Sequence, residues 1–380
     1  MSEPLFRGNE WRYLKACLDS GWVSSAGPFV KQFEQAVAAY VGTSHAVAVI
    51  NGTAALHVAL QLAGVRAEDE VLVSDLTFVA PVNAIRYCGA HPVLVDASER
   101  RWQMDTEKVA AFLEQHCVRR NGTWVNRATR RRVRAILPVH VLGLACEMEE
   151  IMALARQYEL RVVEDAAEGV GVRYRGGHVG TFGDMGVLSF NGNKVVTSGG
   201  GGMLVTNNAQ DAARARYLTT QAKDDPIESI HREVGYNYRL SNLQAAVGLA
   251  QLEQVDQFIQ RKQAIARLYA QFFEGLPGLT LMPTPPDTTA TYWLYTVLLR
   301  PDATLAARQA LIQRLRTKGI EARPLWRPMH ELPVHRDCQR MSGEQASELH
   351  RRSVSLPSGA GLTLDDVRHC AEMFRESLDL

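Results

Sequence analysis

Short apolar runs alternate with amphipathic stretches between residues 45 and 207. The runs are rich in β-branched residues and predict seven strands, at His45–Ile50, Val71–Ser74, Val93–Asp96, Arg134–Val139, Leu160–Glu164, Val187–Phe190 and Met203–Thr206. Helix-spaced apolar positions between the earlier runs predict helices at Thr53–Ala63, Ala80–Cys88, Thr106–Gln115 and Glu147–Tyr158. Near-continuous apolar strands that alternate with helices are typical of a mostly parallel sheet covered on both faces. We therefore expect a large α/β domain.

The pattern changes after Arg239. Ser241 is a suitable N-cap, and it predicts one long helix that continues to about Phe273. A stretch rich in Pro, Gly and Thr then indicates a connector, at Gly275–Thr289. The remaining elements predict a smaller α+β domain, with strands at Tyr292–Leu299 and Ile320–Arg323 and helices at Leu305–Lys318 and Thr363–Ser377. We expect residues 1–240 to form the N-terminal segment and the large domain, 241–275 the linking helix, and 276–380 the small domain.

Composition excludes several classes of protein. Forty-two basic and 41 acidic residues give a net charge of +1, so electrostatics give no reason to expect nucleic acid or an acidic membrane as the main partner. Six scattered cysteines without a C-x-x-C pair predict neither a disulfide framework nor a metal site. The chain has no apolar run of about 20 residues and no signal-peptide pattern, so we expect a cytoplasmic protein.

One stretch of the chain is strongly basic. Seven arginines lie between Arg119 and Arg134, with no acidic residue among them. Asn121-Gly122 within this stretch is a turn signal, so we expect a solvated β-hairpin. Contact with phosphate or another polyanion is the alternative, because arginine forks suit phosphate oxygens.

The candidate chemistry lies after two of the predicted strands. Asp165 stands at the carboxyl end of an apolar strand, where ligands bind in open α/β sheets. Lys194 follows a later strand in the turn-rich segment Phe190–Lys194. A desolvated lysine that forms a Schiff base and a carboxylate that keeps a pyridinium nitrogen protonated are what pyridoxal phosphate requires. On spacing alone, a buried ion pair or an exposed turn lysine remains the alternative.

A candidate phosphate site lies at Asn51–Leu56, which follows a strand and opens a helix. The free backbone N–H groups of such a helix start, together with a hydroxyl, suit an anion, although a good N-cap alone would also explain the segment. The segment is not a Walker A loop, because it lacks G-K-[ST].

Taken together, these motifs resemble the sugar-nucleotide aminotransferases of the DegT/StrS type. The resemblance covers nearly the whole chain, and the segments that carry it are Gly8–Trp11, Gly21–Gly27, Asn51–Leu56, Glu164–Glu168 and Gly235–Asn242. It implies pyridoxal 5'-phosphate as the cofactor. It also implies the type I, aspartate-aminotransferase-like α/β fold, with a large, mostly parallel sheet domain and a smaller C-terminal α+β domain.

The resemblance implies roles for individual residues. Lys194 matches the lysine that holds the cofactor as a Schiff base and then moves the proton, and Asp165 matches the acid on the pyridine nitrogen. Glu168 matches a residue, often Gln, at the phenolic oxygen. The remaining matches are Phe78 for ring stacking, Gly52, Thr53, Ala54 and Ser189 for the phosphate, and Asn237 for a residue donated by the neighbouring subunit of a homodimer. Plain structural roles are the alternative for Phe78, Ser189 and Asn237.

The substrate class follows from the branch of the family. Phe190–Lys194, Arg323–His330 and Leu356–Gly359 resemble enzymes acting on 4-keto-6-deoxy sugars, and Gly21–Gly27 is similar to legionaminic-acid and bacillosamine enzymes. The resemblance thus implies amino transfer from L-glutamate to C4 of UDP-2-acetamido-2,6-dideoxy-hexos-4-ulose. A GDP-perosamine synthase, acting on GDP-4-keto-6-deoxymannose, is the alternative.

Three residues are candidates for the sugar-nucleotide side of the site. Arg323 and His330 are expected to line it, since an arginine fork suits a diphosphate, and Trp22 is expected to close it. Structural roles in the small domain are the alternative for Arg323 and His330. Two other functions are disfavoured: related dehydratases carry histidine in place of Lys194, and a non-catalytic regulator would not need both Asp165 and Lys194.

Overall fold

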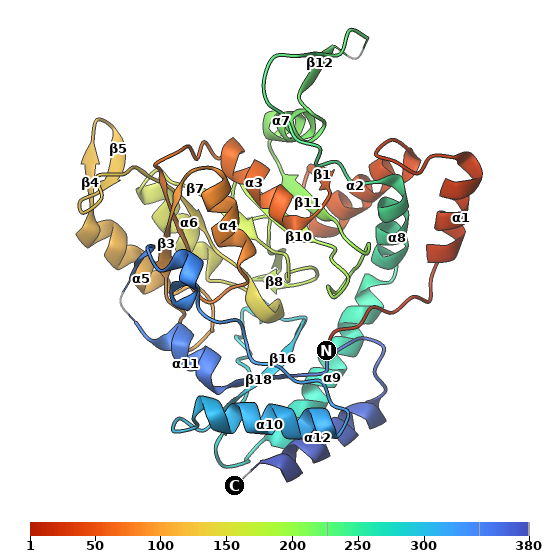
Figure 1. The fold of residues 1–380 in the computed structure, drawn as a ribbon, viewed down its shortest axis with the longest axis vertical. Coiled ribbons are helices and arrows are strands. Elements are labelled where there is room, and N and C mark those ends of the chain that lie inside the picture. The colour runs from red at the N-terminus through yellow and green to blue at the C-terminus, as the bar shows by residue number, and fades with distance from the viewer. Residues whose placement is uncertain (226, 342, 379–380) are drawn as a thin grey trace.

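The computed structural model describes residues 1–380 except 226, 342, 379 and 380. An eight-stranded sheet forms the centre of the larger part of the molecule (Figure 1). Its strands are β1 (His45–Val49), β2 (Glu70–Ser74), β3 (His91–Val95), β6 (Val133–Leu137), β7 (Arg161–Asp165), β10 (Met185–Ser189), β11 (Gly202–Thr206) and β17 (Gln339–Arg340). Their spatial order is β1-β11-β10-β7-β6-β2-β3-β17, and neighbours run parallel except at β11. The seven predicted strands are therefore present, with slightly shifted ends.

Helices pack against this sheet. Helix α3 (Gly52–Leu62) packs on β7, β10 and β11, beside α4 (Ala80–Tyr87) and α7 (Ala209–Thr219). Helix α6 (Met148–Gln157) packs on β6 and β7 beside α5 (Thr106–Ala111), and α2 (Pro28–Val41) packs on β1. The four predicted helices are present, although the one expected over Thr106–Gln115 ends as a π-helical turn, Phe112–His116. Buried strands between helices explain why the strand sequences are so continuously apolar.

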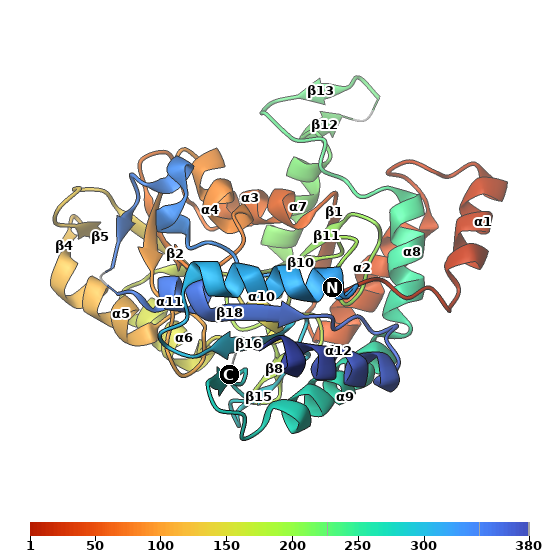
Figure 2. The ribbon, with the colours of Figure 1, turned by 60° about the horizontal axis from the view of Figure 1, so that its bottom comes forward.

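A second, three-stranded antiparallel sheet organises the C-terminal part (Figure 2). Its spatial order is β14 (Leu279–Thr280), β16 (Tyr295–Leu299) and β18 (Ser353–Leu356), with α10 (Leu305–Thr317), α11 (Gln345–Arg352) and α12 (Leu364–Ser377) around it. The strand predicted at Ile320–Arg323 is wrong, because only Arg323 pairs there, as an isolated bridge to Ser355. The edge of β16 is instead taken by β18, which the sequence pattern did not reveal.

The single long helix predicted after Ser241 is also wrong. Ser241 does cap a helix, in a capping box with Gln244, but the chain forms α8 (Asn242–Leu252) and then α9 (Val255–Phe273). The two residues between α8 and α9 contact the start of α1 (Glu10–Ser20). Glu253 accepts from Asn9 and Tyr13, and Gln254 donates to Glu10. No Gly or Pro marks the break, which is why the sequence did not show it. The division of the chain at 240 and 275 stays a prediction.

The basic stretch forms the expected hairpin, β4 (Cys117–Arg120) and β5 (Thr123–Asn126). Asn121 and Gly122 both have positive φ, of 48° and 79°, as a tight two-residue turn requires. Carboxylates neutralise three of its arginines, in the pairs Arg119–Glu159, Arg131–Glu68 and Arg132–Asp69. These internal ion pairs favour the structural interpretation over a polyanion site.

The remaining short strands form two small sheets. Strands β8 (Arg173–Tyr174), β9 (Gly177–His178) and β15 (Thr288–Thr289) form one of them, and β12 (Lys223–Asp225) pairs with β13 (Ile230–His231) in a hairpin that projects from the molecule (Figure 1). Within the part of the chain that the structure describes, no helix combines the length and the apolar character needed to cross a membrane.

Candidate active site

A cavity of about 490 Å³ lies at the carboxyl ends of the parallel strands. Asp165 ends β7, Ser189 ends β10 and Gly52 begins α3, and all three line the cavity. The opposite wall comes from the C-terminal part of the chain, at Trp293, Leu294, Arg323–Trp326 and Ser355. The cavity therefore occupies the position where open α/β sheets bind their ligands.

The start of α3 offers unpaired donors to one end of the cavity. The Asn51 side chain caps the helix by accepting from the Ala54 N–H at 2.8 Å. The first N–H groups of a helix have no partner inside it, and no described residue accepts from those of Gly52 and Thr53. Ser189 lies against the same turn, since a Cβ on Gly52 would stand 3.3 Å from the Ser189 Cβ. These groups suit a phosphate.

Ala54 differs from the other residues of this set, because the Asn51 cap uses its N–H and because it lies outside the cavity lining. Its match to a phosphate contact stays a prediction.

Asp165 is almost completely buried at the cavity floor. One carboxylate oxygen accepts from the Ala167 N–H at 2.9 Å, and no described residue donates to the other. Burial raises the pKa of Asp165 above the ordinary carboxyl value, and the Ala167 N–H, Lys194 and His140 only partly oppose this. A protonated ring nitrogen at the free oxygen would supply the positive charge that this carboxylate lacks.

Lys194 reaches into the cavity from the turn after β10. Its Nζ lies 3.1 Å from Oε1 of Glu168 and 4.0 Å from the centroid of the Trp293 ring. The other Glu168 oxygen accepts from the Leu142 N–H at 2.8 Å. Burial raises the pKa of Glu168, and the charge of Lys194 opposes that shift. The buried ion pair considered as an alternative thus exists, but with Glu168 rather than with Asp165.

Residues behind the cavity floor hold this arrangement in place. The carboxylate of Glu164, fully buried, accepts from the backbone N–H groups of Gly180, Phe182 and Gly183 and lies 3.0 Å from Nε2 of His140. The Cys146 N–H donates to Nδ1 of His140, which assigns the ring proton to Nε2. His140 was not among the predicted site residues; its position just after a predicted strand was the available signal.

Of the other predicted residues, two line the cavity. Phe78 is 55% exposed there, so the alternative that it belongs to the core is wrong. Arg323 lies on the opposite wall and pairs with Glu321 at 2.9 Å. Thr77 was not predicted, but it also lines the cavity, with a buried hydroxyl that lacks a described hydrogen-bond partner.

Three predicted residues lie outside the cavity lining. The His330 side chain is bound to Asp75: its Nδ1 lies 2.5 Å from that carboxylate, to which its backbone N–H also donates. Trp22 is exposed and is not among the lining residues, and its carbonyl accepts from Asn242. Asn237 lines a separate surface depression with Thr219 and Arg239. A role for Asn237 in a neighbouring subunit requires such an outward position, which leaves that prediction open.

The residues present fit pyridoxal phosphate. The donors at Gly52, Thr53 and Ser189 suit its phosphate, Asp165 suits its ring nitrogen, and Lys194 provides the amine. With the mostly parallel sheet, this site defines the class: the protein is a pyridoxal-phosphate-dependent aminotransferase of the type I fold.

The chain belongs to the DegT/DnrJ/EryC1/StrS aminotransferase family, whose family model matches residues 5–375. It is 39% identical to the GDP-perosamine synthase of Caulobacter vibrioides, over 97% of this chain and 95% of the relative. It is 37% identical to the GDP-perosamine synthase of Escherichia coli O157:H7, over 98% of this chain and 97% of that relative. Among solved structures it matches S. venezuelae DesV in complex with a ketimine intermediate, with a TM-score of 0.87, 31% identity, and coverage of 98% and 95%. The protein is a sugar aminotransferase.

Proposed function

We propose that the protein transfers an amino group from L-glutamate to C4 of GDP-4-keto-6-deoxymannose. The observation that carries this proposal is the similarity, over nearly the whole chain, to two relatives named GDP-perosamine synthase. The same observation favours the GDP-linked alternative over the UDP-linked acetamido sugar that the entry sequence Gly21–Gly27 indicated.

Each residue of the cavity has a proposed task. The donors at Gly52, Thr53 and Ser189 would hold the cofactor phosphate, and Phe78 would pack on the ring. When bound, the cofactor supplies the electron sink for the carbon that loses its proton. Lys194 holds the cofactor and carries that proton on Nζ as general acid and base.

The two buried carboxylates have different environments and so different tasks. The free oxygen of Asp165 would accept from the ring nitrogen and so stabilise the positive charge there. Glu168 is fixed by the Leu142 N–H and stands beside Lys194, so it reaches the phenolic oxygen of the ring or holds the amine in its charged form. Arg323, on the opposite wall, binds the diphosphate of the substrate.

The active unit is proposed to be a homodimer. The β12–β13 hairpin projects from the molecule (Figure 1), and Val234, three residues after β13, is 81% exposed. Asn237 lies three residues further along the chain and lines the surface depression rather than its own cavity. A second copy that covers this surface would bury the apolar side chain and could receive Asn237 in its site.

An absorbance titration tests the proposed function. We expect L-glutamate to abolish the band of the cofactor-loaded protein, and GDP-4-keto-6-deoxymannose to restore it. Restoration by UDP-2-acetamido-2,6-dideoxy-4-ketoglucose alone would overturn the proposed substrate and return the UDP-linked interpretation. The Lys194→Ala variant is the control, since it retains the phosphate and ring contacts but has no amine to hold the cofactor.

A further inference from the structure

A buried lysine, Lys262, lies in α9 outside the cavity. Its side chain is fully enclosed, and the residue is only 2% exposed. Nζ donates to Oγ of Ser2 at 3.3 Å and to the carbonyls of Trp293 and Ser358 at 3.1 and 2.7 Å. These three bonds use all three donors of the ammonium, and no ion pair to Lys262 occurs among the described residues. Burial lowers the pKa of Lys262 to about 7.

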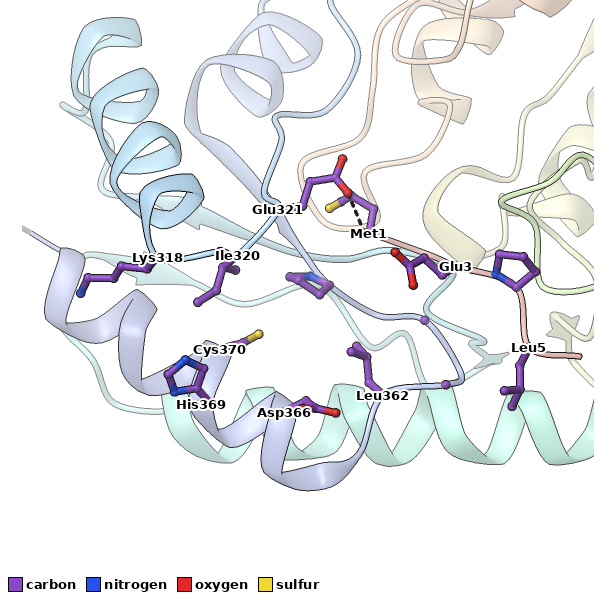
Figure 3. A pocket seen from close by; sticks show the side chains of 15 residues that line it. Met1, Glu3, Leu5, Lys318, Ile320, Glu321, Leu362, Asp366, His369 and Cys370 are labelled. Carbon is purple, nitrogen blue, oxygen red and sulfur yellow. Dashed lines mark hydrogen bonds and ion pairs between the residues drawn. The ribbon is translucent and has the colours of Figure 1, made fainter.

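The N-terminal segment brings two of these acceptors together. Figure 3 shows Met1, Glu3 and Leu5 laid along the C-terminal part, past Glu321 and Leu362. The carbonyl of Met1 accepts from the Ser358 N–H at 2.9 Å, which places Ser2 beside Ser358. The same segment lines a separate cavity of about 550 Å³ (Figure 3). Lys262 thus lies beneath the N-terminal segment Met1–Leu5, which packs on the C-terminal part of the chain.

The third acceptor belongs to a residue of the active site. Trp293 lines the cavity, and its indole N–H donates to the carbonyl of Asn193, the neighbour of Lys194, at 2.7 Å. The face of the same indole lies 4.0 Å from Nζ of Lys194, a distance at which a ring attracts an ammonium. Trp293 therefore contacts both the backbone and the amine of the segment that carries the reactive group.

The backbone at Trp293 must be held against strain. Tyr292, directly before it, has φ of 50°, a left-handed conformation that is unfavourable for an aromatic residue. Two donors fix the carbonyl that follows: Nζ of Lys262, and Oγ of Ser358 at 3.1 Å. A buried cation is a poor stabiliser compared with an apolar side chain of equal size, so stability alone gives no reason for a lysine here.

We propose that Lys262 is a positioning residue: together with Ser358 it fixes the Trp293 carbonyl, and so keeps the Trp293 indole against Lys194 and Asn193. The inference rests on the proposed role of Lys194. Its consequence is that α9, which lies outside the cavity, sets the place of the amine within it. Displacement of a reacting group by about 1 Å is enough to slow an enzyme about a hundredfold.

The test compares two neighbouring residues of α9. Lys262→Met removes the three donors but keeps an apolar stem. Arg261→Met is the matched control, because Arg261 donates to the carbonyls of Ala360 and Leu362, in the same loop, without touching Trp293. We expect both variants to unfold at lower temperature than the parent. Only Lys262→Met should lower kcat, by about tenfold to a hundredfold, and alter the visible circular dichroism of the bound cofactor. Equal behaviour of the two variants in both measurements would overturn the proposal.

Two further variants test the route through the indole. Trp293→Phe keeps a ring but removes the N–H to Asn193. If Lys262 acts through Trp293, the kcat of the double variant Lys262→Met/Trp293→Phe should be no lower than that of the slower single variant. If the two decreases in kcat multiply instead, the route through the indole is refuted. Ser358→Ala removes the second donor to the Trp293 carbonyl and replaces Lys262→Met in the test if that variant does not fold. It should change the visible circular dichroism in the same direction as Lys262→Met. An unchanged spectrum would count against the proposal.

Reduction with borohydride separates this inference from the proposed function. Peptide mapping of the reduced parent protein identifies the lysine that holds the cofactor. If that lysine is not Lys194, the proposed role of Lys194 fails and the inference fails with it. If it is Lys194 and Lys262→Met still matches Arg261→Met, only the inference fails.

Discussion

The glycine at the start of β11 fixes how closely this strand approaches the phosphate donors. A Cβ built on Gly202 would lie 2.5 Å from the carbonyl carbon of Asn51 and 2.7 Å from the Gly52 nitrogen. Ordinary van der Waals contact begins at 3.4 Å, so Gly202→Ala must move one backbone by 3.4 − 2.5 = 0.9 Å. Since Gly202 pairs with Val49 and Ser189 on its two sides, the start of α3 is the segment that must yield.

We expect this shift to cost the site at least one hydrogen bond to the phosphate. A hydrogen bond to a charged group contributes about 1.5–3 kcal/mol, which corresponds to cofactor affinity weakened about tenfold to a hundredfold. Overpacking should also lower the free energy of unfolding by about 1–3 kcal/mol. The assay is a titration of apoprotein with pyridoxal phosphate, followed by tryptophan fluorescence, beside urea unfolding of each variant.

Gly200→Ala is the matched control from the same glycine run. Its Cβ would meet only the flexible end of the Gln244 side chain, at 3.3 Å, so its cofactor affinity should stay within about twofold of the parent. A folded Gly202→Ala protein with the same affinity as Gly200→Ala would refute the assignment of the phosphate to the start of α3.

Three further predictions concern other parts of the structure. Asp165→Asn should lower kcat/KM for L-glutamate by about a hundredfold or more, because the amide cannot hold the ring nitrogen charged; unchanged steady-state kinetics would contradict this. Asp75 raises the pKa of His330, so the stabilisation from this pair is present below the ordinary histidine pKa and is lost as pH rises through the raised value. The free energy of unfolding lost in His330→Gln should therefore shrink as the pH rises above the ordinary histidine pKa of about 6.5 in urea titrations, and a constant difference would refute it. Val234→Glu should yield a monomer in light scattering after size exclusion, whereas a retained dimer would place the interface elsewhere.

The sequence alone predicted the parts of the site that depend on the sheet. Asp165, Ser189 and Gly52 each follow or precede a strand with a clear apolar pattern, and parallel topology brings such positions to one edge. Lys194 could be identified as a candidate because a lysine in a turn after a buried strand is unusual there. The hairpin could also be predicted from local sequence, since its turn depends on two adjacent residues, Asn121 and Gly122, that adopt positive φ readily.

The remaining features depend on contacts between distant segments. His330 binds Asp75 across 255 positions of the chain, and no local pattern marks that pairing. The sequence pattern predicts Trp293 only as an ordinary strand residue, and its contact with the Lys194 amine becomes apparent only in the folded chain. The bond from the Ala54 N–H to Asn51 could have been predicted from the sequence, because Asn51 is a strong N-cap and such a cap uses an early N–H of the helix.

Strand β17 limits how the cavity can open and close. Gln339 and Arg340 pair with Val93 and Leu94, so the chain that leaves the wall of the cavity becomes the outermost strand of the large sheet. Rotation of the C-terminal part about a hinge would break this pairing and the nearby bonds from Ala346 to Asp96. The cavity is thus closed by a chain segment that is itself part of the large sheet, and any swing of the C-terminal wall away from the sheet has to break these bonds first.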